Sequence, residues 1–378
     1  MVMTCTRENL LYGLSLVERA IGRSASLPIL SHVALKSQTG KITFSATDLD
    51  IAVVVSVPAK VDGSGSWAVP YRPLAGFVGA LPEETVQLKP GGKALVVKSG
   101  AFQGKIRTGD AEEFPIIPQL KQAEKVSLPK SGFSEALEAA LVAVAASETR
   151  PELTGVAVIG EANTVTVVAT DTFRLAVRTL PYEGENPFAI ILPQRTAQEV
   201  IRLFKESREN EEKREEGTDR GFTFKITEHQ CLFEDGGLSL TSRLLEGSFP
   251  DFRAIIPRSA AAQVRLSRRE LTRRLEAATF FTGRLNDVHI TLQKEGGGIT
   301  IAAENPDVGA YETSLEGEEG KGEEQTVAFN LRYFLDGLRG FSDEDVVLEF
   351  NGEQKPLLIR PAQGRSGNLY LLMPIRTS

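Results

Sequence analysis

The sequence repeats one pattern three times, and this triplication limits the possible folds more than any other feature. Each third of the 378 residues contains a stretch in which apolar residues recur at intervals of three and four. Such spacing is typical of a helix with one buried face. We predict these first helices over residues 7–21, 133–144 and 269–280. A chain of this length with three like segments favours three domains over one large core.

Polar residues that cap helices precede two of these segments. Thr6 is placed to cap the first helix, and Ser267 with Glu270 has the spacing of a capping box for the third. A capping side chain accepts a hydrogen bond from a backbone N–H in the first helical turn. We therefore expect these two helices to begin directly after Thr6 and Ser267.

A second helical stretch follows later in each third. We predict it over residues 68–81, 191–204 and 328–341. An arginine occupies the same place in all three copies; these residues are Arg72, Arg195 and Arg332.

Between the two helices of each third, alternating apolar and polar residues predict antiparallel hairpins, at 42–57, 165–177 and 299–313. Proline-rich segments at 114–118 and 249–257 close the first two thirds and suit domain boundaries. We therefore predict an α+β protein of three tandem domains, each with two helices packed on antiparallel sheets. The expected domains are residues 1–124, 125–257 and 258–378.

One charged stretch, residues 205–220, interrupts the repeat, and none of its residues suits a core. We expect a solvated, partly helical insertion that prolongs the second helix of the middle domain. A mobile loop and a binding tail are the alternatives.

The composition excludes several classes of protein. The 43 lysines and arginines against 50 acidic residues give a net charge of −7, which is not that of a basic nucleic-acid-binding domain. Cys5 and Cys231 are too few for a disulfide scaffold, a zinc ribbon or an iron–sulfur site. The longest apolar run, residues 139–146, is far shorter than a membrane span. We expect a soluble, cytoplasmic protein with reduced cysteines and no metal or cofactor.

Short motifs in a fixed order along the three thirds resemble the bacterial DNA polymerase III beta subunit family, the DNA sliding clamps. The motifs are Leu27-Pro-Ile-Leu30, Ala46-Thr-Asp-Leu-Asp50, Glu113-Phe-Pro115, Ala169-Thr-Asp171 with Arg174-Leu-Ala176, Phe249-Pro-Asp-Phe-Arg253, Phe329-Asn-Leu-Arg-Tyr333 and Tyr370-Leu-Leu-Met-Pro-Ile-Arg376. The resemblance implies a head-to-tail homodimer in which six similar domains close a ring around double-stranded DNA. It implies that the replicative polymerase, a clamp loader and other proteins are partners, and that the chain has no catalytic site of its own.

A ring that holds DNA and slides on it needs weak, non-specific contacts with phosphates. We therefore expect basic residues spread over the helices of all three domains. The residues predicted to contact DNA are Arg23, Ser24, Arg72, Arg150, Arg195, Arg202, Arg268, Arg269, Arg273 and Arg332. For each single arginine, an ordinary solvated surface charge is the alternative. The middle domain should hold DNA most weakly, because its first helix carries Glu135 and Glu138.

The resemblance also implies a groove between the middle and last domains, in which partners dock a short peptide. The matching positions are Arg150, Leu153, Thr170, Thr172, Phe173, Arg174, Leu175, Pro250, Ile255, Asn330, Tyr333, Leu371, Leu372, Met373, Pro374, Ile375 and Arg376. Family members often have Gly-His where this chain has Thr172-Phe173, so we expect a smaller, more apolar pocket. Without the resemblance, residues 371–375 would be read as an edge strand.

The dimer contact implied by the resemblance joins the first domain of one subunit to the last domain of the other. Phe102 and Gly104 lie near the expected strand on one side, and Phe280 and Phe281 lie near the expected helix on the other.

Two other classes of function compete with this interpretation. Asp48, Asp171 and Asp307 recur at one corner of the repeat, as an enzyme's carboxylates would. They fall in different domains, however, and an aspartate at a strand end more often hydrogen-bonds its own turn. The chain also lacks a GxxxxGK[ST] loop for ATP. A repeat scaffold that binds proteins but not DNA would explain the triplication and the acidic charge, but not the basic helix faces.

Overall fold

The structure is a computed structural model in which the chain forms two compact units. Unit 1 comprises residues 1–130 and 202–244, and unit 2 comprises residues 131–201 and 245–378. The division crosses the middle third, so each unit combines one outer third with part of the middle third. The residues described are 1–118, 120, 123–182, 184, 186–212, 221–294, 297–363 and 367–375.

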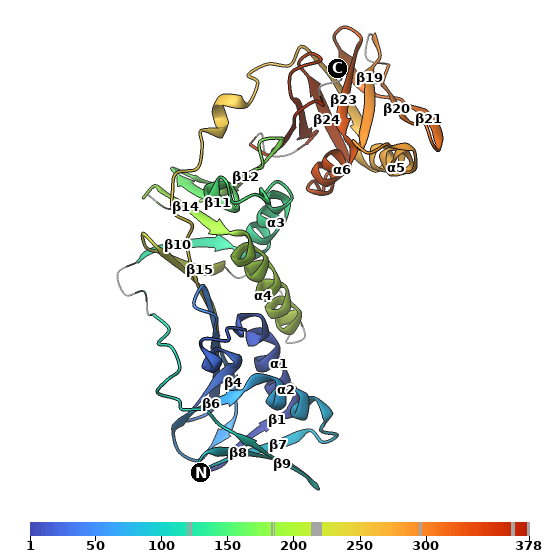
Figure 1. Cartoon of the computed structure of the whole chain (residues 1–378). Helices are drawn as coiled ribbons and strands as arrows, with labels where there is room; N and C mark the ends of the chain where they lie inside the picture. Colours follow the sequence, from blue (N-terminus) through green and yellow to red (C-terminus); the bar gives the residue numbers. More distant parts are fainter. Residues whose placement is uncertain are drawn as a thin grey trace. The chain divides into compact units, whose positions relative to one another are not determined.

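The described α-helices occur as one pair in each third of the chain (Figure 1), as the sequence predicts. Their bounds are α1 Arg7–Val17, α2 Tyr71–Ala80, α3 Lys130–Leu141, α4 Gln194–Glu212, α5 Arg268–Ala278 and α6 Leu331–Arg339. Short 3-10 turns cover η1 Glu18–Ala20, η2 Pro28–Ser31, η3 Pro151–Leu153, η4 Phe252–Ile255 and η5 Thr279–Phe281.

The predicted starts of all three second helices are three residues too early. In each copy these residues close a strand, and the helix follows directly. Ala68, for example, pairs with Ala34 in a sheet, and Ile191 pairs with Ala157. Sheet pairing therefore decides the local structure here, although the apolar spacing also suits a helix. The repeated arginine is the second residue of α2, α4 and α6 alike.

Thr6 and Ser267 are confirmed as the N-caps of their helices. The Thr6 side chain accepts a hydrogen bond from Asn9 N at 3.2 Å, and α1 begins at the next residue. Ser267 Oγ accepts from Glu270 N at 3.5 Å at the start of α5. The carboxylate of Glu270 pairs with Arg274.

Unit 1 contains two antiparallel sheets. The five-stranded sheet has the order β5 Lys60–Val61, β1 Met3–Thr6, β7 Thr85–Gly91, β8 Ala94–Ser99 and β9 Phe102–Arg107. The eight-stranded sheet has the order β10 Glu124–Pro129, β15 Gly221–Ile226, β16 Gln230–Asp235, β17 Leu238–Arg243, β4 Ile51–Pro58, β3 Lys41–Thr47, β2 His32–Gln38 and β6 Gly65–Pro70. The larger sheet crosses from the first repeat into the middle one, because β17 pairs with β4.

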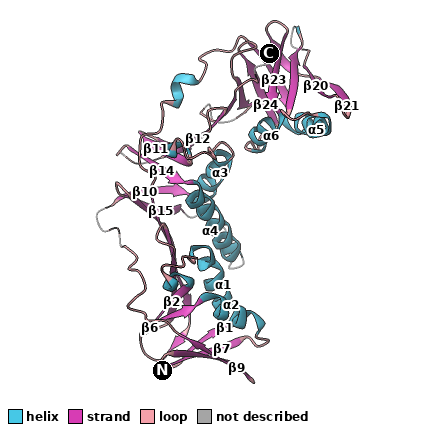
Figure 2. Ribbon diagram, in the orientation of Figure 1, coloured by secondary structure: helices cyan, strands magenta, loops and turns pink. Residues whose placement is uncertain are grey.

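Unit 2 also contains two antiparallel sheets (Figure 2). The nine-stranded sheet has the order β14 Phe188–Pro193, β11 Gly155–Glu161, β12 Thr164–Thr170, β13 Arg174–Pro181, β26 Leu369–Leu372, β25 Leu357–Pro361, β24 Asp345–Phe350, β18 Ala262–Ser267 and β22 Glu318–Lys321. The four-stranded sheet has the order β21 Gly309–Leu315, β20 Ile299–Asn305, β19 Asp287–Leu292 and β23 Gln325–Asn330. The larger sheet crosses from the middle repeat into the last one, because β13 pairs with β26.

Each unit buries helices against its sheets. Leu10, Leu14 and Val17 of α1 are fully buried, as the apolar spacing predicts. A Cβ at Gly13 would lie 2.7 Å from the ring of Phe44 on β3, so a glycine allows α1 to approach the sheet closely. The helices therefore pack on one face of each large sheet, and the connectors between repeats can pack on the other face.

Helix α4 includes the first part of the charged insertion. It continues through Glu212, so the prediction of a helical extension is confirmed for residues 205–212. Residues 213–220 of this insertion lie outside the described residues.

Candidate functional site

A tight corner joins β12 to β13 in unit 2. Asp171 Oδ1 accepts hydrogen bonds from the backbone N–H groups of Phe173 and Arg174, both at 2.9 Å. Thr170 Oγ1 donates to Arg174 O at 2.7 Å and accepts from Thr172 N at 3.2 Å. The aspartate therefore holds its own turn, as the sequence predicts, and this contact assigns it no catalytic role.

The same corner occurs in the other repeats, with one correction. Asp48 Oδ1 accepts from Asp50 N and Ile51 N in the first repeat. In the third repeat the acceptor is Asn305, which binds the N–H of Asp307 at 3.0 Å. The prediction that Asp307 is the matching corner residue is therefore wrong. Asn305 takes this position, because its amide oxygen accepts the turn hydrogen bond that a carboxylate oxygen accepts in the other repeats.

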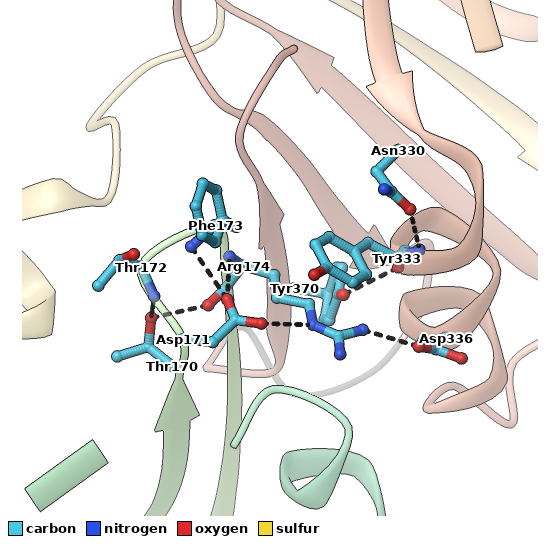
Figure 3. A network of polar contacts seen from close by, with 9 residues as sticks. All are labelled: Thr170, Asp171, Thr172, Phe173, Arg174, Asn330, Tyr333, Asp336 and Tyr370. Carbon is cyan, nitrogen blue, oxygen red and sulfur yellow. Dashed lines mark hydrogen bonds and ion pairs between the residues drawn. The ribbon is translucent and has the colours of Figure 1, made fainter. Parts of the chain in front are cut away.

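Arg174 lies at the centre of a polar network beside this corner (Figure 3). Its Nε is 3.0 Å from Asp171 Oδ2, and its Nη1 is 2.7 Å from Asp336 Oδ2 on α6. The guanidinium also lies 4.0 Å from the centre of the Tyr333 ring. The network links the middle repeat to the first helical turns of α6 in the last repeat, 162 residues away.

Burial and charge act together in this network. Burial opposes the charge of Arg174, but Tyr370, Asp336 and Asp171 together raise the pKa of its guanidinium above the usual range. Burial raises the pKa of Tyr370 well above its usual value, and its hydroxyl donates to Tyr333 O at 2.8 Å. Both side chains therefore keep their neutral-pH protonation states, which fixes the network.

The segment after β26 is tied to both repeats. Met373 N donates to Phe173 O at 2.9 Å, and Ile375 N donates to Ala328 O at 2.8 Å. Pro374 forms an isolated bridge with Phe329. Residues 373–375 are therefore held between the corner of the middle repeat and β23 of the last repeat.

Two exposed apolar side chains, Phe173 and Met373, lie at this junction, and a third, Ile255, lies on η4; we name the three the docking surface. Phe173 is 61% exposed, Ile255 is 52% exposed and Met373 is 36% exposed. Ile255 belongs to η4, whose Phe252 packs in the same core cluster as Leu175, Leu369 and Leu371. Exposed aromatic and methionine side chains of this kind suit contact with apolar groups of a partner.

The remaining residues of the predicted groove have other positions. Four of them are buried: Leu153, Leu175, Leu371 and Leu372. Leu175 and Leu371 belong to the core cluster that contains Phe252 of η4. Thr170 is also buried, and its hydroxyl holds the corner. Pro250, Pro374 and Ile375 are half-buried. Asn330 caps α6 by accepting from Tyr333 N at 3.1 Å. Arg150 is half-exposed and pairs with Glu152 at 2.9 Å. Arg376 lies outside the described residues.

The matching junction in unit 1 differs at the outward positions. Arg243 N donates to Asp50 O at 3.0 Å, which is the same bond as that from Met373 to Phe173. Leu49 has the positive φ of Thr172, 83° against 76°. Unit 1 therefore has a charged pair of residues, Asp50 and Arg243, where unit 2 has an exposed phenylalanine and methionine. At the two positions joined by this bond, the unit 2 junction has apolar side chains and the unit 1 junction has charged ones; Leu49 is the exposed apolar side chain at the unit 1 corner.

Arg178 is a junction residue that the sequence does not identify. It is 6% exposed, and its guanidinium donates to Gly340 O at 2.8 Å, Leu369 O at 3.1 Å and Val177 O at 2.8 Å. Its charge also lies 4.3 Å from the centre of the Phe341 ring. Burial lowers its pKa to about 10, so the side chain stays protonated at neutral pH. Arg178 thus joins β13 to β26 and to the end of α6.

The residues predicted to contact DNA fall into two groups. Those with exposed side chains are Arg23, Ser24, Arg72, Arg150, Arg195, Arg269, Arg273 and Arg332. Arg202 and Arg268 instead bind the protein. Arg202 donates to Leu16 O at 2.9 Å at the end of α1, and Arg268 donates to Asp343 O at 2.7 Å. Both are half-buried, so less of their charge faces solvent.

The residues predicted for the dimer contact lie at sheet edges or beside them. Phe102 is 48% exposed at the start of β9, an edge strand of the five-stranded sheet. Gly104 faces Phe77, whose ring would lie 2.8 Å from a Cβ. Phe280 is 77% exposed, while Phe281 stacks on Tyr311 of β21 at 5.6 Å between ring centres.

Two features of the described residues bear on other functions. These residues contain no group of three or more His, Cys, Asp or Glu side chains arranged to hold a metal ion. Among the described helices, none has the length and apolar character needed to span a membrane. Cys5 and Cys231 are both free thiols in the core, and burial raises the pKa of Cys5 to about 11.

Comparisons of the sequence and of the structure with known proteins identify the same family. The N-terminal, central and C-terminal domains of the DNA polymerase III beta subunit match residues 1–118, 127–251 and 253–376. The beta sliding clamp of Synechocystis sp. is 32% identical, and the match covers 100% of this chain and 99% of that protein. The beta sliding clamp of Bacillus subtilis is 25% identical over 100% of both chains.

Solved structures share the fold over the whole chain. The sliding clamp of Bacillus subtilis matches with a TM-score of 0.92 at 24% identity, covering 100% of both chains. A sliding clamp from Pseudomonas aeruginosa, solved bound to griselimycin, matches with a TM-score of 0.91 at 25% identity and the same coverage. Three repeated clamp domains of this kind define a DNA sliding clamp. The chain belongs to the DNA polymerase III beta subunit family, and its function is that of a replication clamp.

Proposed function

We propose that two copies of this chain join head to tail into a ring that encircles double-stranded DNA. In this assembly the clamp has no catalytic site and acts by keeping its partners on the DNA. We place the three domains of each copy at residues 1–124, 125–257 and 258–378, and we place the protein in the cytoplasm. The resemblance to sliding clamps over the whole chain supports this proposal.

The observation that carries the ring proposal is that in each unit an edge strand carries or contacts a residue predicted for the dimer contact, Phe102 in unit 1 and Phe281 in unit 2. In unit 1 this edge is β9, and in unit 2 it is β21. The opposite edge of the four-stranded sheet, β23, already binds residues 374–375. Free edge strands are templates for pairing with another chain. Pairing of β9 with the partner's β21 would be heterologous, and two such contacts close a two-subunit ring.

The docking surface of unit 2 is the proposed site for partner proteins. We infer that the replicative polymerase and the clamp loader insert apolar side chains of a short segment against Phe173, Met373 and Ile255. The neighbouring Arg174 network supports this role, because it fixes the backbone that presents Phe173. Griselimycin, bound by the Pseudomonas aeruginosa relative, is a compound to test in competition with a partner segment for this surface.

Topological linkage to DNA can be tested directly. The protein is loaded by its cognate loader onto a nicked circular plasmid, and retention at moderate salt is measured before and after the plasmid is linearised. We expect retention on circles and loss from linear DNA, because a ring slides off a free end. Equal retention on both forms would contradict encirclement. No retention on circles would favour a protein scaffold that does not bind DNA.

A further inference from the structure

The connector between the first and middle repeats covers a polar channel in unit 1. This connector spans residues 108–123, of which 108–118, 120 and 123 are described, and the described part lies along the eight-stranded sheet between β9 and β10 (Figure 1). A cavity of about 870 Å³ lies between them, which is within the usual size range of ligand sites. Phe114, Ile117 and Leu120 line it from the connector side and are half-buried.

The corresponding connector in unit 2 packs differently. There Phe249, Phe252 and Ile256 contact an apolar cluster on the nine-stranded sheet. The strand registers allow each residue of the unit 1 sheet to be matched with one of the unit 2 sheet. At four matched positions, unit 1 has a polar residue and unit 2 has an apolar one. The pairs are Lys36 and Ile159, Ser45 and Val168, Ser239 and Leu369, and Thr241 and Leu371. The polar face explains why the unit 1 connector does not close onto its sheet.

The channel has an elongated shape. Its lining residues come from all eight strands of the sheet, from Ser66 on β6 to Lys125 on β10. At ordinary strand spacing, β2 and β10 are about 29 Å apart, which is the length of about nine residues of extended chain. A long, narrow channel of this volume suits one extended peptide better than a compact molecule.

The lining defines the chemistry of an occupant. Lys36, Lys125 and Lys225 line the channel, and of these only Lys225 has an ion pair with a described residue, to Glu234 at 2.5 Å. The hydroxyls of Ser45, Ser239 and Thr241 make no side-chain hydrogen bond within the described chain, so they can bind the backbone of an occupant.

We propose that this channel binds an extended segment of a partner protein with acidic residues near its two ends and apolar side chains between them. The free lysines on β2 and β10 pair with the acidic ends. The apolar side chains contact Phe114, Ile117 and Leu120 on the connector. This site lies entirely in unit 1, and it is independent of the docking surface of unit 2.

The probe for this proposal is a labelled synthetic peptide of about eleven residues, with two glutamates at each end and alternating leucine and serine between them. Its affinity for the full chain is measured by fluorescence anisotropy. We expect the double variant Lys36→Glu/Lys125→Glu to bind at least about tenfold more weakly, because both pairing charges are reversed. Lys93→Glu/Lys98→Glu makes the same charge change at exposed positions outside the channel, and it should bind normally.

A second readout locates the peptide. Isoleucine methyl NMR should show a shift at Ile117, which lines the channel, and none at Ile255 of the docking surface. Absence of peptide binding, an equal loss in both lysine pairs, or a shift at Ile255 alone would each overturn the proposal. If octanesulfonate binds as tightly as the peptide, the channel is a site for small amphipathic anions, and the peptide assignment fails.

Discussion

Thr172 has a backbone conformation that β-branched residues rarely adopt, with φ at 76°. Such a conformation costs about 1–3 kcal/mol and persists only where surrounding contacts hold it. Here the holding contacts are the hydrogen bonds from Thr172 N to Thr170, from Phe173 N to Asp171, and from Met373 N to Phe173 O. The result of this strain is a phenylalanine that faces solvent at the junction of two repeats.

Replacing that phenylalanine should affect binding and leave stability unchanged. We expect Phe173→Ser to weaken binding of the cognate replicative polymerase by about tenfold or more, as loss of a central aromatic contact does. Its free energy of unfolding should stay within about 0.5 kcal/mol, because the side chain is mostly exposed.

Surface plasmon resonance and urea unfolding measure the two quantities. Leu27→Ser is the control, since Leu27 is 44% exposed in unit 1, lies outside both proposed partner sites and should affect neither. Undiminished polymerase binding by Phe173→Ser would remove Phe173 from the docking surface.

For single residues, the sequence predicts which residues belong to the site better than it predicts which residues they contact. Phe173 and Arg174 are found by resemblance to a family. Their partner Asp336 is not, because it is 162 residues away from Arg174 and no local pattern marks it. Arg178 is also missed. Its partners are backbone carbonyls, which every residue carries, so no side-chain pattern in the sequence marks them.

Helix α5 shows that a basic helix is not uniformly available to DNA. Arg268 binds a backbone carbonyl and Arg274 pairs with Glu270 at 2.5 Å. Arg269 and Arg273 are exposed, one helical turn apart, and have no ion pair within the described chain. These two arginines are therefore the ones on α5 best placed for phosphates.

The two arginines should contribute separately to the salt dependence of DNA binding. For Arg269→Gln/Arg273→Gln we expect the slope of log affinity against log salt to fall in magnitude by about two, one unit for each lost phosphate contact. The measurement is a salt titration of binding to a short DNA duplex. Arg258→Gln/Lys294→Gln removes two exposed charges outside this helix and should keep the slope. The same slope in both variants would show that α5 does not contact the DNA.

Element existence follows from the sequence more reliably than element bounds. The sequence predicts all six α-helices of the described residues, because each buries one face and the pair recurs in each third. The first residues of the three second helices are misassigned, because strands β6, β14 and β23 claim them by pairing with distant strands. No residue within residues 68–70, 191–193 or 328–330 signals that pairing.

The proposed ring depends on contacts between two chains. Phe280 is 77% exposed next to Phe281, which stacks on the free edge strand β21. An apolar residue in this position suits burial in a subunit contact.

A charge at that position should therefore oppose ring assembly. We expect Phe280→Asp to raise the dimer dissociation constant by about tenfold or more, because the carboxylate would be desolvated at the interface. Sedimentation equilibrium measures this constant directly. Ile116→Asp introduces the same charge at an exposed position in the connector, and it should remain as dimeric as the parent chain. If Phe280→Asp assembles normally, the subunit contact lies elsewhere.

The matched strand registers of the two large sheets have a consequence for how clamps diverge. Both junctions have the same corner, a residue with a positive φ at the same position, and the same backbone hydrogen bond between the corner and the end of the strand beside it in the sheet. The two junctions differ in the side chains carried on that shared backbone. We therefore expect point substitutions at these outward positions to be enough to add or remove a docking surface, without insertion or backbone rearrangement. The junction of Asp50 and Arg243 is a ready scaffold on which protein engineers can install a second, orthogonal partner site.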